Sequence, residues 1–292
     1  MSIRSIKNQA VMTGKLVAMH SKWLLASERQ ATSHWDGKVH ASMVGGCPTA
    51  AALQICGFGQ TEVVDNVKGL RIFHLGKAIH DMLQREFVAC GAIGLNEDGQ
   101  PNIEVGLSLA MKDGGEIIGH ADGLLEPTVY GEPAVMEAKS INSNALRNLV
   151  EPKEEHKVQA GIYSLALGVK IVVFIYYGKD TSEIREMVYR VTPADMANAE
   201  KRYTKIVALL KAWYDHQVFP EPEYDKPSQA PCSWCKWARV CHSTFDRQTF
   251  IDKCRSEHEE TKKSIKALTP KGGKAKGTRN GAKRLRLHKP RR

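Results

Sequence analysis

Two neighbouring stretches decide the fold of this chain: Ile117-Ile118-Gly119-His120-Ala121-Asp122-Gly123 and Val135-Met136-Glu137-Ala138-Lys139. The first lies in a segment from Glu116 to Leu125, and the second in a segment from Ala134 to Ile141. A turn from Pro127 to Pro133, with Pro and Gly residues, separates the segments. Two short segments on either side of such a turn are predicted to be strands.

The polar residues of these two strands suit hydrolytic chemistry. Glu137 and Lys139 are two positions apart on a strand, so their side chains share one face. Asp122 on the neighbouring strand adds a second carboxylate, and two carboxylates are suitable oxygen ligands for Mg²⁺ or Mn²⁺. Lys139 would position a water molecule or stabilise developing negative charge. The competing interpretation is that Glu137 and Lys139 form an ordinary ion pair.

The rest of the chain predicts a mixed α/β domain with helical additions at both ends. Further strands are expected over Ile103 to Leu109, Ile171 to Tyr177 and Ile184 to Val191. Helices are expected over Thr49 to Ile55, Gly76 to Cys90, Lys153 to Leu167 and Pro193 to Phe219. Residues 1 to about 40 show no clear period.

Composition excludes several classes of protein. The 292 residues are 42% hydrophobic and 25% charged, which is ordinary for a globular chain. No apolar run of ~18 residues is present to span a membrane. The N-terminus lacks the apolar block of a secretory signal, so the expected location is the cytoplasm.

The net charge of +10 is concentrated at the C-terminus. From Thr261 onward there are 13 of the 42 Lys and Arg and no Asp or Glu, so 29 basic residues face 32 acidic ones elsewhere. We predict that 261–292 is a disordered basic tail that binds DNA, with a solvated solubility tail as the alternative. Its candidate contacts are Lys271, Lys274, Lys276, Arg279, Lys283, Arg284 and Arg286.

Three of the seven cysteines are crowded together: Cys232, Cys235 and Cys241. With a fourth thiolate from elsewhere, they would make a four-cysteine site that suits an iron–sulfur cluster or zinc, between which spacing does not choose. Cys56 is one candidate for the fourth ligand. The role would be structural, and a redox-sensing cluster is a further alternative.

In order along the chain, these motifs resemble the RecB-like branch of the PD-(D/E)xK nucleases, specifically members with an iron–sulfur staple. Such members include the AddB nuclease domain, the CRISPR-associated adaptation exonuclease and phage exonucleases. The similarity runs from about Gly45 to Cys241. It rests on Cys47, on Gly76-Lys-Ala-Ile-His80, on Asp122, on Glu137 and Lys139, on Gln159 and Tyr163, and on the three crowded cysteines.

The resemblance implies a restriction-endonuclease-like fold, a mixed central sheet flanked by helices, with terminal helical additions tied by a cluster on four cysteines. It also implies the site. His80, Asp122, Glu137 and the backbone carbonyl of Ala138 would hold Mg²⁺ or Mn²⁺. Asp122, Glu137, Lys139, Gln159 and Tyr163 would be catalytic. Cys47, Cys232, Cys235 and Cys241 would hold a [4Fe–4S] cluster, favoured over zinc.

We therefore expect a metal-dependent DNA exonuclease that acts on DNA ends or single strands, in a bacterial cell or a phage-infected host. A role in DNA recombination or replication, with a partner protein or as a homo-oligomer, fits the resemblance. The alternative is a nucleic-acid-binding module with a metal cluster and no turnover. The expected segments are a helical region (1–74), the nuclease core (75–220), a cluster-binding segment (221–260) and the tail (261–292).

Overall fold

The computed structural model describes residues 14–32, 38–56, 67–242, 248–249 and 251–252. The chain divides into two units, Met1–Ile251 and Asp252–Arg292, and every helix and strand discussed below lies in the first. The predicted basic tail falls outside the described residues. No helix among the described residues is both long enough and apolar enough to cross a membrane.

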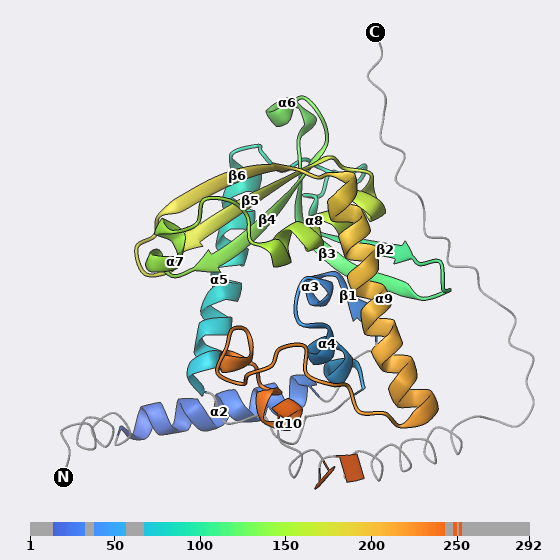
Figure 1. Ribbon diagram of the computed structural model, residues 1–292. Coiled ribbons are helices and arrows are strands. Elements are labelled where there is room, and N and C mark those ends of the chain that lie inside the picture. The colour runs from blue at the N-terminus through green and yellow to red at the C-terminus, as the bar shows by residue number, and fades with distance from the viewer. Residues whose placement is uncertain (1–13, 33–37, 57–66, 243–247, 250, 253–292) are drawn as a thin grey trace, which may run out of the picture. The chain divides into compact units, whose positions relative to one another are not determined.

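The core is a six-stranded mixed sheet in the order β1-β3-β4-β5-β6, with β2 paired to β3 (Figure 1). Strands β4 and β5 are parallel, as are β1 and β3, and the remaining pairs are antiparallel. The strands are β1 (Val39–His40), β2 (Ile103–Ala110), β3 (Glu116–Leu125), β4 (Ala134–Ile141), β5 (Ile171–Gly178) and β6 (Ile184–Arg190).

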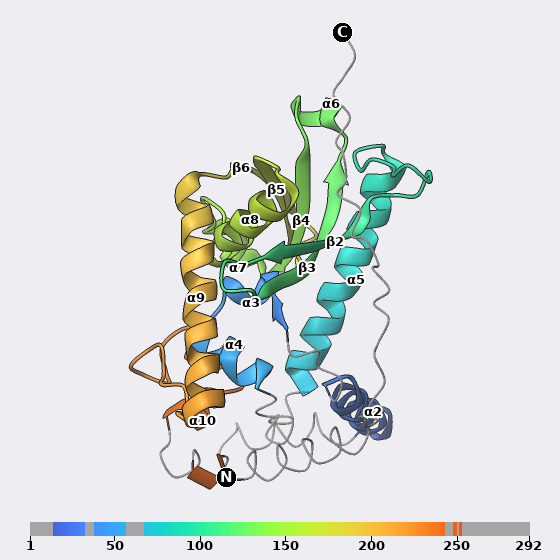
Figure 2. The ribbon, with the colours of Figure 1, turned by 90° about the vertical axis from the view of Figure 1, so that its right-hand side faces the viewer.

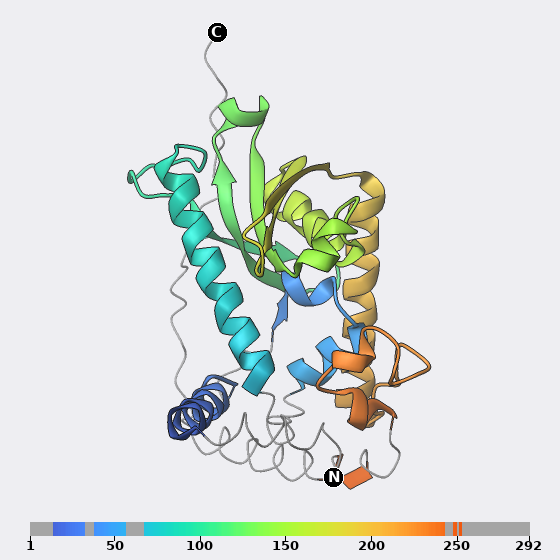
Figure 3. The same ribbon diagram turned by 90° about the vertical axis from the view of Figure 1, so that its left-hand side faces the viewer.

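Helices cover both faces of the sheet because its central strand is apolar on both sides. On β5, Phe174 and Tyr176 face a core shared with α8 (Glu154–Leu167) and α9 (Pro193–His216). Val173 and Ile175 face the opposite core, which α5 (Val67–Ala89) completes with Ile79 and Leu83. Figures 2 and 3 show α5 and α9 on opposite sides of the sheet. The predicted mixed α/β fold, with a mixed sheet flanked by helices, is confirmed.

The remaining described helices are α2 (Lys15–Thr32), α3 (Ala41–Val44), α4 (Pro48–Ile55), α6 (Pro127–Tyr130), α7 (Ser143–Arg147), the 3-10 helix η1 (Cys232–Trp234) and α10 (Ala238–His242). Helix α2 packs on α5, and α4 packs on α9.

The N-terminal helices differ from the sequence prediction in extent. Helix α5 begins at Val67, nine residues before the predicted start, and α2 occupies a region where no period was evident. The apolar repeat that marks α5 starts at Ile79, where the helix meets the sheet. Its earlier turns carry exposed side chains, so they contribute no buried period that a sequence pattern could show.

Candidate active site

The candidate site lies in a fork between β3 and β4. Their pairing runs from Leu125↔Ala134 to Gly123↔Met136 and then stops. The next residues outward are Asp122 and Glu137, so two carboxylates stand where the ladder opens. The N–H of Ala138 donates to Asp122 Oδ2 at 2.7 Å. A side chain thus satisfies a buried backbone donor on the β3 side of β4, beyond the end of the β3–β4 ladder.

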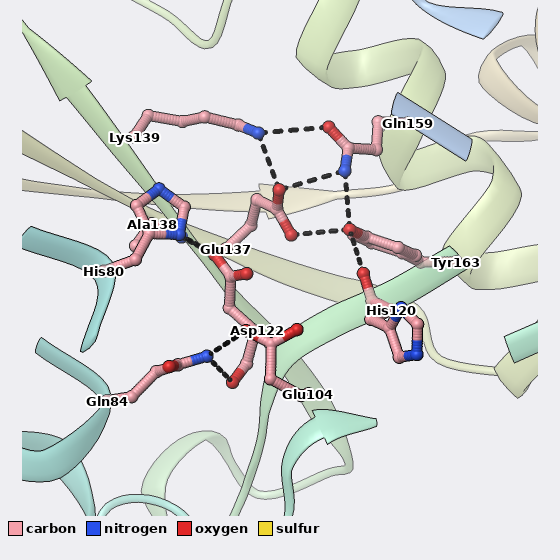
Figure 4. Close-up of polar contacts among 10 residues, drawn as sticks. All are labelled: His80, Gln84, Glu104, His120, Asp122, Glu137, Ala138, Lys139, Gln159 and Tyr163. Atoms are coloured by element: carbon pink, nitrogen blue, oxygen red, sulfur yellow. Dashed lines mark hydrogen bonds and ion pairs between the residues drawn. The ribbon is translucent and has the colours of Figure 1, made fainter. Parts of the chain in front are cut away.

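Glu137 is the centre of a buried hydrogen-bond network (Figure 4). Its Oε1 accepts from Lys139 Nζ at 2.6 Å and from Gln159 Nε2 at 2.9 Å, and its Oε2 accepts from Tyr163 at 2.6 Å. Burial raises the pKa of Glu137; Lys139 opposes this effect and the charge of Asp122 adds to it. Glu137 therefore sits where a further positive charge would be favourable.

Helix α8 supplies the other half of this network. Gln159 and Tyr163 are one turn apart and both buried, and Gln159 Nε2 lies 2.6 Å from the Tyr163 hydroxyl. Lys139 Nζ also donates to Gln159 Oε1 at 3.2 Å. Burial, then the charge of Glu137, raises the pKa of Tyr163 well above its ordinary value, so the phenol stays protonated.

Lys139 remains a cation in this setting. Burial alone would lower its pKa, but the charge of Glu137 and the hydrogen bond between them raise it above its ordinary value. Lys139 is thus a partly buried, charged ammonium held two residues from a carboxylate. Such a group can stabilise negative charge that develops nearby.

His80 reaches Asp122 from the other side of the sheet. On α5, His80 Nδ1 lies 3.3 Å from Asp122 Oδ2. The hydrogen bond to Asp122 raises the pKa of His80, and burial only partly offsets this. The structure therefore brings together every predicted site residue of the core, and their catalytic and metal-binding roles stay predictions.

Two residues that sequence analysis missed extend the site. Gln84 is buried one turn after His80, and its Nε2 donates to Glu104 Oε1 at 2.8 Å and to the Asp122 carbonyl at 3.0 Å. Glu104 has a φ of 46°, in the left-handed region that non-glycine residues rarely adopt. The i, i+4 spacing from His80 was the available signal for Gln84, whereas nothing in the sequence marks the backbone of Glu104.

A second polar pair lies beside Lys139. His156 Nδ1 is 2.7 Å from the hydroxyl of Tyr176, the residue that pairs with Lys139 across β4 and β5. Burial and the charge of Lys139 lower the pKa of His156 to about 3. His156 is thus a neutral imidazole next to a buried cation. Its position one turn before Gln159 was the only sequence signal.

The predicted cluster cysteines are spread over several elements: Cys47 precedes α4, Cys232 lies in η1 and Cys241 in α10. Burial raises the pKa of the Cys47 thiol at the start of α4; backbone N–H groups of Ala50 and Thr49 oppose this, and the charge of Cys235 adds to it. The charge of Cys235 also contributes to the raised pKa of Cys232, after burial. Cys241 is buried in α10, whereas Cys56 interacts with Tyr214 on α9.

The part of the chain that the structure describes contains no preformed set of metal ligands. No three His, Cys, Asp or Glu residues there are arranged to hold an ion. In the fork, both oxygens of Glu137 already accept hydrogen bonds. The donor types still fit a hard divalent cation, because two buried carboxylates and an imidazole converge there.

Comparison with family models and with curated protein sequences gives no match. Among solved structures, the chain is similar to SSO0001, with a TM-score of 0.54 and 18% identity over 79% of this chain and 97% of that chain. Other matches are the alkaline exonuclease LHK-Exo from Laribacter hongkongensis (TM-score 0.44, 18% identity, 62% of this chain and 91% of that chain). For the same enzyme in complex with dAMP, the TM-score is 0.42 and the identity 17%, over 62% of this chain and 91% of that chain. Of these three likenesses, the one to SSO0001 has a TM-score above 0.5, and it supports the fold alone.

Proposed function

We propose that this protein is a metal-dependent DNA nuclease, with an exonuclease acting on ends or single strands as the specific form. The observation that carries the proposal is the fork itself. Two carboxylates, Asp122 and Glu137, stand at the opening between two strands, and the partly buried ammonium of Lys139 lies 2.6 Å from Glu137. An ordinary ion pair would not need the second carboxylate or the donors from α8.

The proposed metal ligands are His80, Asp122, Glu137 and the carbonyl of Ala138. When bound, Mg²⁺ or Mn²⁺ would neutralise the scissile phosphate and activate water. The raised pKa of Glu137 supports this assignment, because a nearby carboxylate contributes to it and a divalent cation would offset that repulsion. The three hydrogen bonds to Glu137 use three of its roughly four lone-pair sites, so Oε2 keeps one site with which it could hold an ion.

The chain's own groups have distinct tasks in this proposal. Lys139 orients the attacking water or stabilises charge on the phosphate oxygens. Gln159 and Tyr163 hold Glu137 in place, and the Tyr163 hydroxyl, 3.1 Å from the His120 carbonyl, also ties α8 to β3. Gln84 and His80 fix Asp122 from the α5 side.

The cysteines carry a separate proposal. Cys47, Cys232, Cys235 and Cys241 would hold a [4Fe–4S] cluster, or zinc, with a structural role. The contribution of Cys235 to the raised pKa of Cys47 supports this, because 188 positions separate the two residues along the chain. The basic tail and the four-segment division of the chain remain proposals beside it. Deleting residues 261–292 should weaken DNA binding and flatten its salt dependence.

The test is hydrolysis of end-labelled single-stranded and duplex DNA by the purified protein. Turnover should require Mn²⁺ or Mg²⁺, stop with EDTA and return when Mn²⁺ is added in excess. Tight DNA binding with no turnover under any divalent metal would overturn the proposal and leave the nucleic-acid-binding module in its place.

A further inference from the structure

Helix α2 and the first half of α5 form an exposed aromatic surface at a distance from the sheet. Trp23 is 57% exposed and Phe73 is 64% exposed. The His20 ring lies 6.1 Å from Trp23 at an interplanar angle of 27°, so the rings of α2 and α5 form one aromatic group. An exposed apolar group on a polar surface is a candidate site for binding a partner. Figures 1 and 3 show α5 extending past the sheet to reach α2.

The two helices meet through these rings. Trp23 packs edge-on against His74, with centroids 6.3 Å apart, and His74 lies 6.1 Å from Phe73. Arg71 Nη2 donates to Ser21 Oγ at 3.0 Å. The rings are therefore held on a shared frame, and we call them, with the cations named next, the α2–α5 surface.

The charge around the rings is mainly positive. The segments next to the rings, 15–26 of α2 and 67–80 of α5, contain no Asp or Glu, whereas Glu28, Asp81 and Glu86 lie further along the two helices. Their exposed cations are Lys15, Lys22, Lys68, Arg71 and Lys77. The molecule outside its C-terminal tail carries slightly more acidic than basic residues, so this local excess is not a general property of the surface. Such a surface complements a polyanion.

The surface also leads to the candidate active site. Phe73, Lys77 and His80 are spaced i, i+4 and i+7, so they lie along one side of α5. A rise of ~1.5 Å per residue puts Phe73 ~10 Å from His80 along the helix axis. Between them, Gly76 lies against the end of β4, where a Cβ would be 3.2 Å from Ser140 Oγ.

We propose that the α2–α5 surface binds single-stranded DNA and delivers it to the fork, an inference that rests on the proposed nuclease function. Bases would stack on Trp23 and Phe73, and phosphates would contact the surrounding cations, the combination typical of single-strand binding. Single strands are favoured over duplex because a ring can stack only on a base whose face is open. The surface thus assigns the substrate class of the site.

The test is fluorescence anisotropy with a labelled oligo-dT and a blunt duplex, in EDTA so that no turnover occurs. Phe73→Ala and Trp23→Ala should each weaken oligo-dT binding ~10-fold, since stacking is worth ~1–3 kcal/mol per base. Duplex binding should change much less. Ile184→Ala, which truncates an exposed side chain on β6, is the matched control and should bind as wild type does.

The cations have a separate readout. Lys77→Gln should reduce the slope of log affinity against log salt by ~0.7, the value for one single-strand phosphate contact. Lys211→Gln, on an exposed turn of α9, is the control. Circular dichroism melts of all variants establish that the fold is intact.

Unchanged oligo-dT affinity in both ring variants would overturn the inference, as would equal losses for single strand and duplex. A change of oligomeric state in the ring variants, with DNA affinity kept, would show a protein interface instead. If wild type cleaves DNA but the ring variants bind oligo-dT as wild type does, this inference fails and the nuclease proposal stands. If oligo-dT binding depends on the rings but wild type cleaves no DNA, the nuclease proposal fails and the α2–α5 surface remains a single-strand binding site.

Discussion

The fork and the cysteine set both combine residues from distant parts of the chain, yet they differ in the contacts between their residues and in the elements that carry them. Three donors converge on Glu137 within 2.9 Å. For the cysteine set, the observed link between Cys47 and the distant Cys235 is a contribution of Cys235 to the raised pKa of Cys47. Glu137 and Lys139 lie on β4, which is paired along its whole length with β5. Cys232 and Cys241 lie on η1 and α10, a single turn and a five-residue helix.

The difference indicates what each site needs in order to form. Strand register and helix packing fix the fork without any ligand, so it is pre-organised. The cysteine set lies on shorter elements, and a bound metal ion often supplies part of the folding energy at four-cysteine sites. We therefore expect substitutions of Glu137 and Lys139 to affect chemistry more than folding, and substitutions of the cysteines to affect metal content and stability together.

The largest effect is expected for Glu137→Gln. Loss of the carboxylate should reduce DNA hydrolysis by at least ~10³-fold, since a ligand of the proposed metal site contributes several kcal/mol and each 1.36 kcal/mol is about tenfold. Initial rates on labelled DNA provide the measurement. Glu86→Gln on an exposed turn of α5 is the control, and equal rates for the two variants would remove Glu137 from the site.

The cysteine set is next in size. After anaerobic purification, wild type should contain about four irons and acid-labile sulfide, and Cys235→Ser should contain almost none. Cys90→Ser, at the exposed C-terminal end of α5, should keep the full content. One zinc and no iron in wild type would replace the cluster with a zinc site, and no metal at all would remove the four-cysteine proposal.

Gln84→Leu tests the side of the fork that faces α5. The change removes a buried donor to Glu104 and to the Asp122 carbonyl, so the free energy of unfolding should fall by about 1 to 3 kcal/mol. Urea unfolding measures it. Gln100→Leu, at an exposed position before β2, should change stability by less than ~0.5 kcal/mol. Similar losses in both variants would mean that Gln84 has no special role.

The smallest effect concerns His156 and acid. Its folded pKa of about 3 is below the unfolded value of ~6.5, so between these values the unfolded chain binds the extra proton. Stability should therefore decline as pH falls below ~6.5. In His156→Asn the decline should be shallower by up to ~1.4 kcal/mol per pH unit. Tyr176→Phe, which leaves the imidazole buried, should keep the wild-type slope in urea titrations between pH 7 and 5.

The sequence predicted β5 from a continuous apolar run and β6 from alternation, and it predicted β3 and β4 on either side of a turn with Pro and Gly. The strand period placed Glu137 and Lys139 on one face. That His80, Asp122, Gln159 and Tyr163 join them was implied by the resemblance to the RecB-like nucleases. The stop in β3–β4 pairing at Gly123↔Met136 was not readable, since it depends on the turn geometry and on Asp122 accepting from Ala138.

Other features had no local pattern to reveal them. Helix α2 is largely exposed, so it carries no buried stripe. Gln84 and Glu104 act through a contact between α5 and β2 that only the tertiary structure creates. The cysteine spacing suggested a metal site, but the choice between iron and zinc rests on chemistry that neither the spacing nor the fold determines.

The most direct test of the central claim is cleavage of end-labelled single-stranded DNA in Mn²⁺ by wild type and by Lys139→Ala. We predict readily measured turnover by wild type and a loss of ~10²–10³-fold or more in the variant, the size expected when one charge-stabilising group is removed. Circular dichroism and iron content should be unchanged. Equal cleavage by the two proteins would contradict the assignment of the fork as the active site.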